Sequence, residues 1–128
     1  MFEFPNDFEW LPPWKPVDDD YLAMVFSDPF EPGSATTTPR QRLVDELHRE
    51  MAEGHELFGE TLSVIAVYTL THKDFIYTTA NPDKPIAQVH LTWCRETNPM
   101  WPSTYVYESL DSWKAEMIMD HLEFKTGT

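Results

Sequence analysis

Residues 61–93, TLSVIAVYTLTHKDFIYTTANPDKPIAQVHLTW, decide the fold. Residues 61–70 and 86–93 show the period of two that is typical of β-strands, and the first of these segments is apolar on much of both faces. Residues 75–79 follow residues 61–70 after a short connection and predict a further strand. The connections between these segments are short, and residues 81–84 have the composition of a turn. Because strands joined by such short connections pair with each other in antiparallel fashion, the stretch predicts a three-stranded meander.

A helix is predicted to begin at Thr38, before the meander. Thr38 has the side chain of an N-cap residue, and Pro39 suits the first helical position. Gln41 completes a capping box. An apolar stripe at four-residue spacing follows, formed by Leu43, Leu47 and Met51 with Val44 beside it. Gly54 is the expected C-cap.

A fourth strand and a second helix are predicted after the meander. Residues 95–103 contain two prolines and should form a loop, and residues 104–108 alternate like a strand. Ser109 and Asp111 are rival N-caps for a final helix that continues to about Leu122. The expected inward face of this helix consists of Leu110, Trp113 and Met117, with Ile118 and Leu122 beside it.

The order of these elements predicts an α+β fold, a two-layer sandwich. It consists of a four-stranded antiparallel meander with one helix before it and one after it, and both helices are expected on one face. Residues 38–128 form this single domain. Strict alternation along the first strand would place Leu62, Val64, Ala66, Tyr68 and Leu70 on one face, and Ile65 and Val67 on the other.

Residues 1–37 form an acidic arm that is rich in proline and aromatic residues. Its prolines exclude a long helix or a central strand. Its large apolar side chains are too costly to leave in water; they are Phe2, Phe4, Phe8, Trp10, Leu11 and Trp14. We therefore expect the arm to pack on the domain or on a neighbouring subunit. This favours a homodimer, formed through the arm or through a sheet edge. Within it, the apolar run at residues 21–26 predicts a short edge strand.

The charge limits the kinds of partner. Twenty-two Asp and Glu residues stand against nine Lys and Arg residues, a formal net charge of −13. Such a field repels phosphate, so neither nucleic acid nor an anionic membrane is an expected partner. No apolar run approaches the roughly 18 to 20 residues that span a bilayer, and the start lacks the pattern of a signal peptide. One cysteine, Cys94, fits a reducing compartment, and we expect a cytoplasmic protein.

No catalytic, metal or cofactor site is predicted. None of the five histidines lies in a spacing typical of zinc sites. Cys94 would need an adjacent base to act as a nucleophile, and a lone cysteine more often packs as a small hydrophobic residue. Four glycines supply no phosphate-binding loop, and the serine-hydrolase motif is absent from the sequence.

Aromatic residues are concentrated between Trp93 and Trp113, around a loop that Pro99 and Pro102 stiffen. Such a loop serves as the lid of a small core, as a protein-binding surface or as the wall of a ligand pocket. His90 belongs to the same region, on the strand face opposite Ala87, Val89, Leu91 and Trp93, where it is either solvated surface or the floor of a site. The candidate binding residues are His90, Thr92, Trp93, Trp101 and Tyr105.

These features favour a non-catalytic cytosolic protein-binding domain. An acidic surface accelerates encounter with a basic protein, and aromatic side chains supply binding energy. An inhibitor or immunity-type protein for a basic partner is one form that such a domain could take. The alternative is a small enzyme or a small-molecule-binding domain that uses the region of His90, Trp93 and Trp101.

Overall fold

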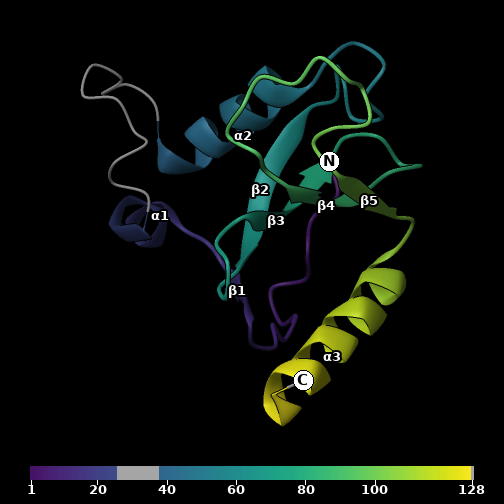
Figure 1. Ribbon diagram of the computed structural model, residues 1–128. Helices are drawn as coiled ribbons and strands as arrows, with labels where there is room; N and C mark the ends of the chain where they lie inside the picture. The colour runs from purple at the N-terminus through teal and green to yellow at the C-terminus, as the bar shows by residue number, and fades with distance from the viewer. Residues whose placement is uncertain (26–37, 128) are drawn as a thin grey trace.

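The computed structural model describes residues 1–25 and 38–127 (Figure 1). Its centre is a five-stranded antiparallel sheet in which neighbours in space are neighbours in sequence. The strands are β1 (Trp14–Pro16), β2 (Leu62–Tyr68), β3 (Asp74–Thr79), β4 (Ile86–His90) and β5 (Thr104–Tyr107). The described residues also form the helices α1 (Asp19–Val25), α2 (Pro39–Glu50) and α3 (Leu110–Thr126). The α+β class is confirmed, but the sheet has five strands instead of the predicted four.

The additional strand, β1, comes from the arm. It pairs with β2, where Trp14 lies opposite Tyr68. The carbonyl oxygen of Pro13 accepts hydrogen bonds from both the amide and the hydroxyl of Thr69. Prolines are tolerated here because β1 lies at the edge of the sheet. The arm is therefore built into the sheet of its own chain.

The prediction of a short strand at residues 21–26 is wrong for residues 21–25, because these residues belong to α1. The Asp18 carboxylate accepts a hydrogen bond from the amide of Tyr21, as an N-cap side chain does. Leu22 is completely buried, and Val17, Tyr21 and Val25 pack beside it against the core. Residue 26 lies outside the described residues.

Helix α2 begins as predicted and ends earlier. The Thr38 hydroxyl accepts a hydrogen bond from the amide of Gln41, which confirms the N-cap. The helix ends at Glu50, because Met51 already has extended backbone angles; the predicted C-cap at Gly54 is wrong. The apolar stripe of α2 packs against one face of the sheet, over Val64, Phe75, Tyr77 and Val89.

A β-bulge in β2 breaks the strict alternation that the sequence predicts. The register between β2 and β3 shifts between Val64 and Ala66. As a result Leu62, Val64 and Val67 join the core cluster beneath α2, whereas Ala66 joins the cluster on the other face. The predicted placing of Val64 and Ala66 on one face is therefore wrong.

Helix α3 covers the face of the sheet opposite α2. On β3, Phe75 and Tyr77 belong to the cluster beneath α2, whereas Ile76 between them belongs to the cluster of α3. Figure 1 shows α2 above the sheet and α3 below it. The prediction of both helices on one face is wrong, because the central strands are apolar on both faces and each face needs a cover.

The ends and the inward face of α3 were partly predicted. Ser109 is the N-cap, Trp113 and Met117 are buried, and the helix runs past Leu122 to Thr126. Ile118 and Leu122, expected beside the inward face, are 37% and 51% exposed.

The aromatic residues of the arm complete the cover on the face of α3. The ring centroids of Phe4, Phe8 and Trp10 lie 4.9 to 5.1 Å from one another. The rings of Trp10 and Trp14 pack in turn against Trp113 of α3, with ring centroids 6.1 and 5.1 Å from that of Trp113. Residues 1–25 of the arm therefore pack on their own domain. No helix in residues 1–25 or 38–127 has the length and apolar character to cross a membrane.

Candidate functional site

Thr92 and Trp93, two of the predicted site residues, are held by Glu50 at the end of α2. The Glu50 side chain is completely buried. One carboxylate oxygen accepts hydrogen bonds from the amide and the hydroxyl of Thr92, at 2.8 and 3.0 Å, and the other accepts from the amide of Trp93 at 2.8 Å. Trp93 has a positive φ of 59°, a conformation that is costly for a bulky residue. Glu50 thus stabilises a strained turn where the chain leaves β4.

The environment of Glu50 favours its protonated form. Burial and, second, a side-chain hydrogen bond with Glu46 raise the pKa of the Glu50 carboxyl from 4.5 to about 7, although the hydrogen bonds from Thr92 and Trp93 act in the opposite direction. Glu46 is in turn paired with Arg49 at 2.7 Å. The role of Glu50 follows from its contacts: its carboxylate binds the protein's own backbone and is used structurally.

His55 holds the other end of the aromatic loop, which we define as residues 93–103. Its Nδ1 accepts a hydrogen bond from the amide of Leu57 at 3.0 Å, so its Nε2 carries the proton. Nε2 lies 2.9 Å from the carbonyl oxygen of Pro102 and 3.2 Å from the hydroxyl of Thr104. His55 is 5% exposed. Two buried side chains, Glu50 and His55, therefore hold the loop at its two ends.

The tip of the aromatic loop faces solvent. Met100 is 77% exposed and Trp101 is 47% exposed, and the peptide bond that follows Trp101 is cis. The amide of Trp101 donates to the carbonyl oxygen of Asn98, and the Asn98 side chain accepts from the amide of Met100. Trp101 therefore lies on a hydrogen-bonded turn with part of its indole free for contact.

His90 lies on the side of the sheet that faces α3. Its Nδ1 is 3.1 Å from a carboxylate oxygen of Asp74 on the neighbouring strand, and its side chain is 47% exposed. Trp93 packs against the other core cluster, beneath α2. His90 and Trp93 therefore do not converge on one pocket.

Tyr105 lies in the wall of a pocket between the sheet and α3. This pocket, which we call the tyrosine cleft, has a volume of about 340 Å³ and is lined by Gln88, Tyr105, Tyr107 and Glu116. Tyr105 is opposite Gln88 in the pairing of β4 with β5, and the Tyr107 hydroxyl donates to the Gln88 side-chain oxygen at 3.0 Å. The Tyr105 ring is 69% exposed. The cleft thus combines a fixed wall with one accessible ring.

Carboxylates on α3 make the surroundings of the cleft electronegative. Burial, followed by repulsion from Asp120 and Glu123, raises the pKa of Glu116. Burial also raises the pKa of Asp120, which is repelled by Glu123 and Asp74 but held by a hydrogen bond from the Trp14 indole at 2.9 Å. Because these carboxylates repel one another, a cation placed among them is favoured.

Sequence reasoning missed the residues that shape these sites. Glu50 was detectable in principle, because it lies three residues after Leu47 and thus on the apolar side of α2. Glu116 gave no local signal, since its place beside Tyr105 and Tyr107 depends on how α3 crosses the sheet.

Within residues 1–25 and 38–127, no three His, Cys, Asp or Glu side chains gather in a way that could hold a metal ion. Cys94 is exposed and unbridged. Comparisons with protein-family models, with curated proteins and with solved structures find no match for this chain.

Proposed function

We propose that this chain is a non-catalytic, cytoplasmic protein-binding domain for a basic partner, of the kind that an inhibitor or immunity-type protein represents. The observation that carries the proposal is the tyrosine cleft, where two tyrosine rings, an amide and a carboxylate line one hollow. The formal net charge of −13 adds long-range attraction for a basic protein.

An arginine side chain fits the chemistry of the cleft. Its planar guanidinium can stack on the exposed ring of Tyr105. Its N–H groups can donate to the Glu116 carboxylate and to the oxygen of Gln88, which already accepts from Tyr107. Positive charge at this point also offsets the repulsion from Asp120 and Glu123, which adds to burial in raising the pKa of Glu116. Stacking, hydrogen bonding and charge attraction would thus all stabilise an arginine side chain in the tyrosine cleft.

A second part of the proposed interface is the exposed side of the aromatic loop. The loop leads directly into β5, an edge strand that carries Tyr105. Trp101 is the type of anchor that contributes most to protein interfaces, and Met100 beside it adapts to irregular surfaces. We place the partner along this edge, with a basic side chain in the cleft and apolar contacts at the loop.

Titration calorimetry with the full chain and an acetylated tetra-arginine amide tests the cleft. Tyr105→Ala should weaken binding by about 1 kcal/mol, about fivefold, which is the worth of a moderately exposed cation–π contact. Glu116→Gln should weaken it more than Glu53→Gln does, although both substitutions remove one negative charge. Glu53 is exposed outside the cleft and is the matched control.

Equal effects of Glu116→Gln and Glu53→Gln would contradict the proposal, because the peptide would then sense only the net charge. Binding that is independent of Tyr105 would contradict it too. The alternative site at His90, Trp93 and Trp101 has less support, because the His90 side chain pairs with Asp74 on the side of α3, whereas Trp93, beyond the end of β4, packs beneath α2.

We also propose that the chain forms a homodimer, through a surface other than the arm. Phe2, Phe4, Phe8, Trp10 and Trp14 of the arm pack on their own domain and so no longer demand a neighbour. The outer side of α3 instead exposes a row of apolar side chains, Ile118, Met119 and Leu122. If a homodimer forms, we expect this row at its interface.

A further inference from the structure

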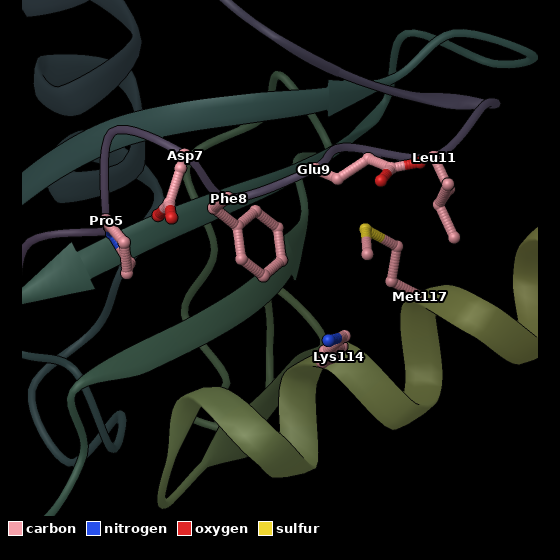
Figure 2. A pocket seen from close by; sticks show the side chains of 7 residues that line it. All are labelled: Pro5, Asp7, Phe8, Glu9, Leu11, Lys114 and Met117. Atoms are coloured by element: carbon pink, nitrogen blue, oxygen red, sulfur yellow. The ribbon is translucent and has the colours of Figure 1, made fainter.

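A pocket of about 420 Å³ lies between the arm and α3, apart from the tyrosine cleft. Its apolar walls are Pro5, Phe8, Leu11 and Met117, and its charged side chains are Asp7, Glu9 and Lys114. Figure 2 shows Asp7, Phe8 and Leu11 extending from the arm toward α3, and Met117 extending from α3 toward the arm. An apolar hollow with a few charged groups is the usual composition of a small-molecule site.

The wall on the side of the arm is fixed by contacts of its own. The amide of Phe8 donates to the carbonyl oxygen of Pro5, and the amide of Trp14 donates to that of Leu11, both at 3.0 Å. The Phe8 ring lies 4.9 Å from the ring of Trp10. Asp7 and Glu9 are therefore carried by a braced turn, and the pocket exists before any ligand enters.

The charged groups of this pocket have no ion-pair partners in residues 1–25 and 38–127. Asp7 and Glu9 offer negative charge on the arm, and Lys114 offers positive charge on α3, yet no salt bridge joins them. Lys114 would repel a ligand that carries only positive charge, and the two carboxylates would repel a ligand that carries only negative charge. A molecule that carries both charges satisfies both sides of the pocket.

We propose that this pocket binds a free amino acid with an apolar side chain. Its ammonium group would face Asp7 and Glu9, its carboxylate would face Lys114, and its side chain would contact Phe8 and Leu11. The apolar contact supplies affinity, and the two opposite charges supply selectivity for a zwitterion.

Titration of the full chain with L-phenylalanine, followed by calorimetry and by NMR shifts of residues 5–11, tests this site. Phenethylamine lacks the carboxylate and 3-phenylpropionate lacks the ammonium group, so both should bind about fivefold more weakly, the upper worth of one exposed ion pair. Lys114→Met should weaken the binding of L-phenylalanine by about the same factor and should not weaken the binding of phenethylamine. The double substitution Asp7→Asn and Glu9→Gln should have the opposite selectivity. It should weaken the binding of phenethylamine and leave the binding of 3-phenylpropionate no weaker.

Lys125→Met is the matched control, because Lys125 is an exposed lysine of the same helix that does not line the pocket. Its L-phenylalanine affinity should equal that of the unsubstituted protein. The proposal is overturned if L-phenylalanine shows no saturable binding up to about 10 mM. It is also overturned if phenethylamine binds as tightly as L-phenylalanine, or if Lys114→Met and Lys125→Met have equal effects.

Discussion

Replacing Glu50 by Gln should make the stability of the protein less dependent on pH. Folding raises the pKa of the Glu50 carboxyl from 4.5 to about 7, a difference worth roughly 3 kcal/mol. The folded state binds the proton of Glu50 more tightly than the unfolded state does. The stabilisation that results is therefore fully present below pH 4.5 and is lost as the pH rises through 7. About 2 kcal/mol of this loss falls between pH 5.5 and 8.5.

The Glu50→Gln variant has no proton to lose at this position. Its amide nitrogen cannot accept the hydrogen bond that Trp93 donates to the second oxygen, so we expect a cost of about 1 to 3 kcal/mol at pH 5.5. At pH 8.5 the unsubstituted protein carries the buried charge and the variant does not. The difference in stability should then be about 2 kcal/mol smaller and can reverse its sign.

Urea unfolding followed by tryptophan fluorescence, at both pH values, measures this difference. Groups that titrate equally in the two proteins cancel from it. Glu53→Gln, an exposed substitution shortly after α2, is the control and should change stability by less than about 0.5 kcal/mol at either pH. A Glu50→Gln difference that stays constant between pH 5.5 and 8.5 would refute the reasoning, because Glu50 would then be ionised in both conditions.

Three further substitutions separate structural from surface roles. His55→Ala should destabilise the fold by about 1 to 3 kcal/mol, because it leaves the buried amide of Leu57 without its acceptor and removes one of the donors to the carbonyl of Pro102; an unchanged urea midpoint would show that the aromatic loop is held elsewhere. His90→Ala should cost less than about 1 kcal/mol, since the pair with Asp74 is partly exposed, and a larger loss in the same unfolding assay would mean that this pair is structural. Leu122→Glu should convert any dimer to monomer in sedimentation equilibrium without loss of stability, and a dimer that persists would place the interface away from the outer side of α3.

The regular elements of the fold were predictable where a local pattern decides them. The period of two in residues 61–70 and 86–93 and the short connections between the segments identified β2, β3 and β4, although β4 ends at His90 instead of Trp93. The capping residues Thr38 and Ser109 located the starts of α2 and α3. Each of these signals is contained within a few neighbouring residues, so no knowledge of the tertiary structure is needed to read it.

The errors arose where long-range contacts outweigh local preference. The strand β1 is three residues long and lies among prolines, and only its pairing with Tyr68 and its neighbours makes it a strand. The bulge between Val64 and Ala66 has no sequence signature, yet it changes which side chains face α2. The apolar character of the central strands on both faces did carry the information that both faces are covered.

The candidate site was predictable only in part, for the same reason. Tyr105 could be selected as an aromatic residue on a short strand near a loop. Its neighbours in the cleft, Gln88 and Glu116, come from β4 and α3, and their meeting depends on how α3 crosses the sheet. Composition gave the charge, but only the fold shows which carboxylates stand beside an accessible ring.

The closure between the arm and α3 has a consequence for the nascent chain. Trp14 is bound to Asp120, 106 positions later, and the carbonyl oxygen of Pro12 contacts His121, 109 positions later. A ribosome releases the arm long before it has made the helix that shelters it. Until then Trp10 and Trp14 lack their contacts with Trp113, and exposed aromatic side chains are the condition in which newly made chains recruit chaperones or aggregate. Synthesis of α3 is the event that ends this exposure, so a premature stop before residue 110 would leave the arm without its cover.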